Sequence, residues 1–284
     1  MYHKFKTNEN VGTNMKRIIL FSCSILLLSI TVFAKDFKSG EVYGKIKSSK
    51  TITIGISKHY PPLNFKSNSK GVEKEMISLL KKYLNVQVKV VPMSVREYIP
   101  ALEKGTVDIV IAGLSRNLVR GKRIWFSKPY LSATPAVLAN KRRLPQTTFG
   151  ESFQTSKIKT IWDLQNITRF KVAVKKGSSY QHLLERKLPD MPRVLVSSNK
   201  EGLKLLSDGS VHGFVHDSIY LQYLYRSSAR YRSGFVLLQG GSQSEKICIG
   251  LPKGDVALKI NIDLFVDEIV RQGYVSDWLK KYNR

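Results

Sequence analysis

The chain has 284 residues, enough for two modest domains or one large one, and its 42% apolar residues can build real cores, which excludes a disordered or low-complexity polypeptide. The formal net charge of +26 favours an anionic partner: nucleic acid, an acidic membrane surface or an anionic ligand. The basic residues are scattered as pairs, however, with no long basic block and no interleaved aromatic residues. A solvated basic surface is therefore favoured, and no nucleic-acid partner is expected.

Residues 1–34 have the parts of an upstream extension followed by a secretory signal peptide. Lys16 and Arg17 precede an apolar run over 18–33, which small Ala34 ends before the expected cleavage point. Met1 and Met15 are both candidates for the true start. The run is shorter than the roughly 20 apolar residues of a membrane span, although an uncleaved anchor stays an alternative. We expect a periplasmic or otherwise extracytoplasmic protein, with 35–50 as a loose polar leader.

Cleavage after residue 34 leaves Cys248 as the one cysteine and a net charge of +23. No intrachain disulfide and no thiolate zinc site can then form. The four histidines of the mature chain have no metal-ligand spacing and no companion nucleophile; they are His59, His182, His212 and His216. No metal and no cofactor are therefore expected.

A first series of alternating strands and helices is predicted over residues 51–112. The expected elements are a strand at 51–57, a helix at 71–84, a strand at 86–91, a helix ending at 102 and a strand from 109. Ser94 and Glu97 form a capping-box pattern that would open the second helix, but Pro100 falls in its second turn, so this helix begins later or bends. Short connections between such elements predict a parallel sheet covered on both faces.

A second series follows a predicted connector over 137–154. The expected elements are a strand at 170–174, a helix at 180–188, a strand at 194–197, a helix at 200–206, a strand at 211–215 and a helix to 225. Residues 102–107 and 206–211 share one pattern, a helix end, a glycine turn and a strand start. Apolar runs at 235–238 and 246–251 and two final helices provide the return path. Two lobes of similar construction are therefore predicted.

The loop after the strand at 109 carries groups that suit a carboxylate. Gly113 and Ser115 turn the chain, and Arg120 follows within a few residues. A guanidinium binds both oxygens of a carboxylate at once. The alternative for this stretch is a strand, a turn and a solvated basic helix.

Three more loops that follow predicted strands carry usable groups, and ligands in open α/β sheets lie beyond the carboxyl ends of strands. They contain Tyr60, then Ser178 and Ser179, then His216 and Asp217. Together the four loops offer one cation, one anion, hydroxyls, amides and an aromatic face, the combination that a zwitterionic amino acid needs. Arg120, Ser115 and the Ser179 amide would hold its carboxylate; Asp217 and the Gly113 carbonyl would hold its ammonium group.

Each of these residues has a purely structural alternative. Tyr60 would brace the turn at Pro61 and Pro62, and Asp217 would be the N-cap of the following helix. Ser178 and Ser179 would cap the helix after them, although a capped helix still points its amides at an anion.

Three sequence patterns resemble one known family. Residues 113–130 follow G-[LM]-S-x-T-x-x-R…F-S-x-P-Y, residues 60–65 follow Y-P-P-F-x-F, and residues 71–76 follow G-F-D-x-D-L. They resemble bacterial solute-binding protein family 3, the amino-acid-binding proteins of ABC importers, over nearly all of the mature chain. The chain departs from the family at Asn117, where threonine is usual, at Arg116, and at Glu73, where aspartate is usual. Val95 stands where the family often has an aromatic residue on the ligand.

The resemblance implies a two-lobed α/β fold of the type II periplasmic-binding-protein kind, each lobe a mostly parallel sheet flanked by helices. Lobe one would comprise 51–138 and 244–284, lobe two 139–243, and the crossing strands near 138 and 243 would form the hinge. The protein would be a monomer that captures a polar or basic L-amino acid and delivers it to the membrane permease of an ABC importer. The implied ligand-binding residues are Tyr60, Glu73, Val95, Gly113, Ser115, Arg120, Ser178, Ser179 and Asp217, with no catalytic residue.

Two rival functions remain. An enzyme on the same scaffold, resembling cyclohexadienyl dehydratase, would use Glu73, Lys176 or His216 as acid or base. A basic surface-adhesion or nucleic-acid-binding module is the second.

The preference for a polar or basic ligand depends on charge balance in the loops, with Glu73 and Glu75 available to a basic side chain.

Overall fold

The computed structural model describes residues 40–66, 69–145, 158–240 and 244–283. The predicted signal peptide, half of the predicted connector and the predicted crossing point at 243 lie outside these residues.

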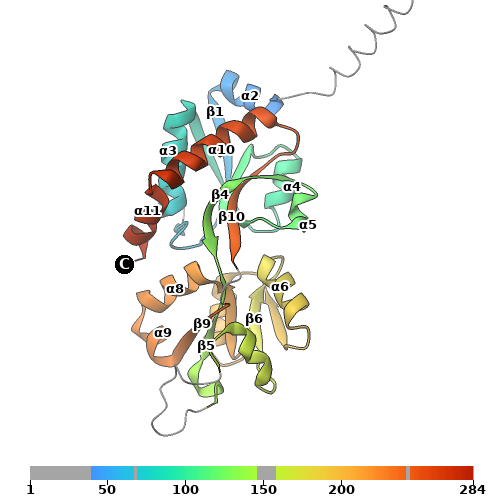
Figure 1. Cartoon of the computed structure of the whole chain (residues 1–284), viewed down its shortest axis with the longest axis vertical. Coiled ribbons are helices and arrows are strands. Elements are labelled where there is room, and N and C mark those ends of the chain that lie inside the picture. Colours follow the sequence, from blue (N-terminus) through green and yellow to red (C-terminus); the bar gives the residue numbers. More distant parts are fainter. Residues whose placement is uncertain (1–39, 67–68, 146–157, 241–243, 284) are drawn as a thin grey trace, which may run out of the picture.

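Two five-stranded mixed sheets lie one above the other along the long axis (Figure 1). In the first sheet the strands run in the order β2 (Gln87–Met93), β1 (Thr51–Ser57), β3 (Ile109–Ser115), β10 (Glu245–Leu251) and β4 (Trp125–Ala133). In the second the order is β7 (Arg193–Val196), β6 (Val172–Lys175), β8 (Gly213–Asp217), β5 (Pro135–Asn140) and β9 (Phe235–Gln239). In each sheet the first three strands pair with one another in parallel. The fourth strand pairs antiparallel with both the third and the fifth. The two sheets thus share one topology, as the internal repeat predicted.

Helices flank both sheets (Figure 1). Those of the first sheet are α2 (Glu41–Ser49), α3 (Val72–Leu84), α4 (Tyr98–Glu103), α5 (Leu118–Gly121), α10 (Val256–Arg271) and α11 (Tyr274–Tyr282). Those of the second are α6 (Ser179–Lys187), α7 (Asn199–Ser207), α8 (Ser218–Ser227), α9 (Ala229–Gly234) and the short 3-10 helices η2 (Lys141–Arg143) and η4 (Ile161–Asn166). Across the described ranges, no helix combines the length and apolar content needed to cross a bilayer.

The cores follow the apolar spacing of the sequence. Met76 and Leu80 on α3, and Leu258 and Ile262 on α10, have no exposed surface and pack in one cluster on the first sheet. Their spacing of four residues puts each pair on one helix face, toward the sheet. Apolar clusters also lie on both faces of the second sheet. Each sheet is therefore buried on both faces, which fixes where its strand ends meet.

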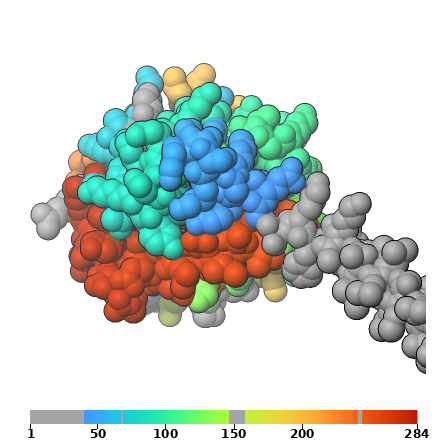
Figure 2. Space-filling view, turned by 90° about the horizontal axis from the view of Figure 1, so that it is seen from above, coloured from blue at the N-terminus to red at the C-terminus, as the bar shows by residue number. Residues whose placement is uncertain are grey.

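The predicted loose leader over 35–50 contains a helix. In α2, Ile46 is fully buried and the Tyr43 amide donates to Asp255 Oδ2 at 2.8 Å. Figure 2 shows α2 (blue) on the surface between α10 (red) and the first-series helices (teal). The prediction failed because one buried isoleucine among lysines and serines gives no visible helical period.

The predicted connector over 137–154 begins inside a strand. β5 is buried almost throughout, and a continuous apolar strand shows no alternation that would reveal it. The second predicted helix also starts later than its capping-box pattern suggested. α4 begins at Tyr98, and the Glu97 side chain accepts the Ser94 amide outside the helix.

The chain passes from the first sheet to the second at Thr134, between β4 and β5, and returns between Gln239 and Glu245. The Thr134 amide donates to Ser218 Oγ at 3.1 Å, and the Ser218 amide donates to the Thr134 carbonyl at 2.8 Å. This reciprocal pair ties the first crossing to the start of α8. We propose Thr134 as the first lobe boundary in place of residue 138.

Glycine-to-alanine changes in two helices should act in opposite directions. Glycine weakens a helix interior by about 0.5–1 kcal/mol relative to alanine, so Gly44→Ala in α2, where no atom lies within 4 Å of the new Cβ, should stabilise by that amount. Gly202→Ala in α7 should instead destabilise by about 1–3 kcal/mol, because the new Cβ would lie 2.4 Å from the Phe214 ring. Urea unfolding of both variants measures the difference, and stabilisation by Gly202→Ala would contradict the packing described.

Candidate functional site

A cavity of about 220 Å³ lies between the two sheets. Its walls come from the loop after β1, from β3 and α5 in the first sheet, and from the ends of β6, β7 and β8 in the second. It is therefore placed at the carboxyl ends of parallel strands from both sheets, where ligands bind in open α/β folds. It is smaller than the roughly 300–1,000 Å³ of sites for drug-sized ligands, which suits a molecule of amino-acid size.

Arg120 lines this cavity and is held from two directions. Its Nη1 donates to the Ser115 carbonyl at 2.8 Å, and its amide donates to Asn117 Oδ1 at 2.9 Å. Asn117 is thus the N-cap of α5, a task that asparagine and threonine side chains both perform. Burial lowers the pKa of Arg120, but a guanidinium stays charged at physiological pH. The cavity therefore has a fixed cation.

Two serines from different sheets meet next to Arg120. Ser115 Oγ, on β3, lies 3.3 Å from Ser179 Oγ, at the start of α6. Ser178 is the N-cap of α6, and its Oγ accepts the Gln181 amide at 3.2 Å. The predicted carboxylate-binding residues Arg120, Ser115 and Ser179 all line one cavity, together with the predicted ligand-binding residue Ser178.

Glu245, at the start of β10, is a residue of this region that the sequence did not reveal. Its Oε2 accepts a hydrogen bond from Ser179 Oγ at 2.8 Å, and its charge raises the pKa of Arg120 against the effect of burial. Its position follows only from the return of the chain to the first sheet, so no local motif marks it. Glu245 joins the crossing strand to α6.

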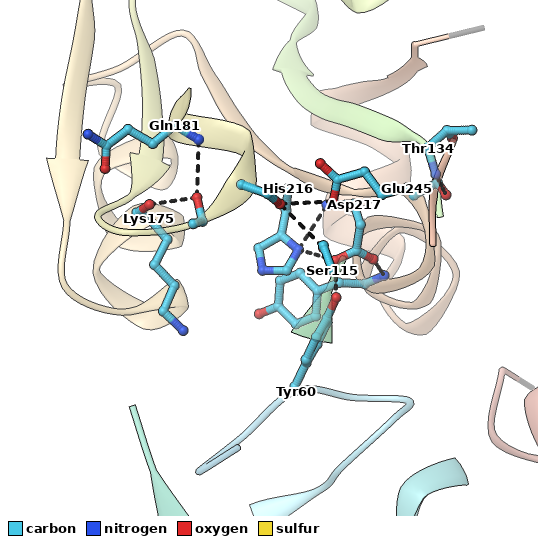
Figure 3. Close-up of polar contacts among 12 residues, drawn as sticks. Tyr60, Ser115, Thr134, Lys175, Gln181, His216, Asp217 and Glu245 are labelled. Atoms are coloured by element: carbon cyan, nitrogen blue, oxygen red, sulfur yellow. Dashed lines mark hydrogen bonds and ion pairs between the residues drawn. The ribbon is translucent and has the colours of Figure 1, made fainter. Parts of the chain in front are cut away.

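Tyr60 and Asp217 also connect the two sheets (Figure 3). The Tyr60 hydroxyl, from the loop after β1, donates to Oδ2 of Asp217, at the end of β8. His216 Nδ1 lies 2.6 Å from the same oxygen, and the Tyr220 amide donates to Oδ1 at 2.8 Å. Asp217 is therefore the N-cap of α8, the structural alternative considered for it, and it also bridges the sheets.

Asp217 is fully buried and does not line the cavity, whereas Tyr60 and His216 do. Burial raises the pKa of its carboxyl group, but His216, Tyr60 and the Tyr220 amide outweigh this and hold the pKa below its ordinary value. Asp217 is thus a buried carboxylate just behind the cavity wall.

Glu73 lies behind the cavity rather than in its lining. It is fully buried, and its Oε1 accepts the Gly113 amide at 2.6 Å and the Tyr130 hydroxyl at 2.8 Å. Gly113 itself lines the cavity with φ of +61°, and a Cβ there would lie 2.2 Å from the Tyr60 ring, so only glycine fits. Glu73 therefore positions the Gly113 turn; Val95, the remaining predicted residue, lines the cavity.

The charged residues that line the cavity are all basic. Apart from its histidines they are Lys58, Arg120, Lys175 and Lys200, and no aspartate or glutamate of the described chain is in the lining. Lys175 was missed by sequence reasoning, which singled out its neighbour Lys176. Lys175, at the end of β6, lines the cavity, whereas Lys176, the first residue after the strand, is exposed. Within the described ranges, no group of three or more potential ligand side chains could hold a metal ion.

A two-lobed α/β molecule with a small cavity between its sheets, and with an arginine and a helix N-terminus in the cavity wall, is of the periplasmic-binding type. The model of the bacterial extracellular solute-binding proteins, family 3, matches residues 52–284, and the chain belongs to this family. Members of this family act outside the cytoplasm, bind amino acids and work with ABC transporters.

Known relatives differ in the ligand that they are named for. A probable histidine-binding protein of Campylobacter jejuni is 24% identical over 82% of this chain and 84% of its own length. The glutamate/aspartate import solute-binding protein of Escherichia coli is 22% identical over 86% of this chain and 80% of its own. A solved structure of an ancestral amino-acid-binding protein, described as a precursor of cyclohexadienyl dehydratase, superimposes with a TM-score of 0.69 at 25% identity, over 85% of this chain and 98% of its own.

The buried carboxyl group of Glu73 should make stability depend on pH. Burial raises its pKa to about 7 from an ordinary 4.5, although the Tyr130 and Gly113 hydrogen bonds lower it. Between these values the folded state holds a proton that the unfolded state has released, so wild-type stability should fall as the pH rises through this window. Glu73→Gln removes the effect, so its melting temperature relative to wild type should be higher at pH 8 than at pH 5.

Glu75→Gln is the matched control. Glu75 is paired with Lys281 and Tyr282, whose hydrogen bonds lower its pKa, so its stabilisation is lost only as the pH falls below its ordinary value of 4.5. The offset of this variant from wild type should stay constant between pH 5 and 8. A constant offset for Glu73→Gln as well would contradict the raised pKa.

Proposed function

We propose that this protein is exported, captures one free L-amino acid between its two lobes and delivers it to the permease of an ABC importer. The observation that supports this most directly is Arg120, a partly buried cation in a cavity whose walls come from both sheets. A buried charge is costly unless it is matched, so the cavity calls for a small anionic group that both lobes can enclose.

The ligand carboxylate would bind between Arg120, Ser115 and the first amides of α6. The guanidinium supplies a two-point grip, and the helix N-terminus favours negative charge. Ser178, as the N-cap, keeps the start of α6 in this orientation. The ligand would replace part of the contact between Ser179 and Glu245, since its carboxylate needs the same donors.

The ligand ammonium group would bind near Tyr60 and the Gly113 carbonyl, with Asp217 as its counter-charge. In the structure the Tyr60 hydroxyl covers the Asp217 carboxylate. A direct contact between the ammonium and Asp217 therefore requires the Tyr60 hydroxyl to be displaced. The depressed pKa of Asp217 keeps it ionised for this purpose.

The lobes would move about the crossings at Thr134 and between Gln239 and Glu245. Tyr60 and Asp217, and Ser115 and Ser179, are pairs that join one lobe to the other. Closure would be stabilised by contacts of the ligand that form only in the shut state, so the ligand shifts an existing equilibrium. A monomer suffices, because both walls of the cavity belong to one chain.

A dehydratase-like enzyme is the weaker alternative. Of its three candidate acids or bases, Glu73 is behind the cavity wall and Lys176 is exposed, so only His216 lines the cavity. Its Nδ1 is engaged with Asp217. Incubation with prephenate and arogenate tests this alternative, and release of carbon dioxide with aromatic product would support it.

Arg120→Lys should weaken amino-acid binding at least about 100-fold, about 2.7 kcal/mol, because lysine keeps the charge but loses the planar grip. The experiment is a thermal-shift screen of the twenty amino acids on the wild type, followed by calorimetry with the best ligand on both proteins. Arg116→Lys is the matched control, since Arg116 is exposed and outside the cavity lining, and it should bind like wild type. If no amino acid raises the melting temperature, the proposed function is wrong.

A further inference from the structure

Lys175 is a cation inside the cavity that the amino-acid scheme leaves unmatched. It is the last residue of β6, and its side chain extends into the space beside His216 and Tyr60, with no dashed contact to its Nζ (Figure 3). Within the described chain, its Nζ has no hydrogen bond and no ion pair. Burial alone lowers the pKa of Lys175, with no nearby carboxylate to oppose the shift.

The carboxylates beside the cavity are already engaged elsewhere. Glu245 accepts a hydrogen bond from Ser179 and interacts with Arg120. Glu201, in the first turn of α7, accepts the amide of Ser197 at 2.8 Å and its hydroxyl at 2.6 Å, and it is exposed. Neither side chain lines the cavity. The chain therefore provides no anion for Lys175.

The backbone places Lys175 beside the start of α7. Lys175 pairs with Val196 on β7, so it lies next to Ser197 and the start of α7, where Lys200 also lines the wall. Arg120 and Ser115 come from the opposite sheet. The cavity thus has Arg120 from the first lobe for the α-carboxylate, and Lys175, beside the start of α7, from the second.

We propose that Lys175 and the start of α7 form a side-chain subsite for a second carboxylate, so that the ligand is an acidic amino acid. This inference rests on the proposed function. Arg120 matches the α-carboxylate and Asp217 matches the ammonium group, which leaves Lys175 to be matched by an anion that the ligand brings. Lys175 is partly buried, and an unpaired charge that is shielded from water is costly, so closure on a neutral or basic ligand would leave this cost unrelieved.

The subsite replaces the expectation of a polar or basic ligand. That expectation depended on Glu73 and Glu75 facing the ligand. Glu73 is buried behind Gly113, and Glu75 pairs with Lys281 and Tyr282 outside the cavity. A basic side chain would therefore meet cations and no carboxylate in the lining.

Calorimetry with isosteric pairs tests the proposal. In glutamine and asparagine an amide NH2 group replaces one side-chain carboxylate oxygen of glutamate and aspartate. The ratio of dissociation constants within each pair therefore isolates the side-chain charge. The wild type should bind one acid at least 10-fold more tightly than its amide, and more tightly than arginine or lysine. An amide or a basic amino acid that binds as tightly as either acid would overturn the subsite but leave the proposed function standing, whereas binding of no amino acid would overturn the proposed function.

Variants at neighbouring lysines assign the effect to Lys175. Lys175→Gln should weaken the acid at least 10-fold and bring the ratio of acid to amide close to one, while Lys175→Arg, which keeps the charge, should retain the preference. Lys176→Gln makes the same change of charge on an exposed residue outside the lining and should leave the ratio unchanged. Melting curves without ligand confirm that each variant is folded. A ratio that survives in folded Lys175→Gln would overturn the role of Lys175.

Discussion

A charge held away from water must be matched by an opposite charge or by several hydrogen bonds, and this constraint organises the region between the two sheets. The buried carboxylate of Asp217 is satisfied by Tyr60 from one sheet and by His216 and α8 from the other. Glu73 is satisfied on one oxygen by the Gly113 amide and Tyr130, while its second oxygen has no partner in the described chain. The charged residues of the cavity lining are all basic, so an anion that pairs with them has to come from a bound ligand.

The fold could be predicted wherever apolar spacing was regular. β1 was predicted with its observed bounds, and the glycine turns of the repeat are observed as residues with positive φ, +65° at Gly105 and +81° at Gly209. α2 and β5 were not predicted because a single buried isoleucine and a continuous apolar strand carry no period. These elements are stabilised by contacts with distant segments, such as Asp255 with α2, and a local pattern cannot show such contacts.

The site could be predicted where one motif contained it. Arg120, Ser115 and Gly113 lie within eight residues, and the structure brings them to one cavity with Ser178 and Ser179. Lys175 and Glu245 could not be predicted, since the direction of a side chain at a strand end and the return of β10 depend on register across the whole sheet. Which of these residues touch a ligand remains a prediction.

The crossing strands have a consequence for how the chain can fold. All five strands of the second sheet lie between Pro135 and Gln239, so that sheet can form from one contiguous segment. The first sheet needs β10, which enters from beyond residue 244 and separates β3 from β4. Until β10 arrives, β3 is paired only with β1 and β4 has no partner strand, so the backbone groups that face β10 stay unpaired. Completion of the first lobe therefore has to wait for the carboxyl-terminal segment, whereas the second sheet needs no strand from outside residues 135–239.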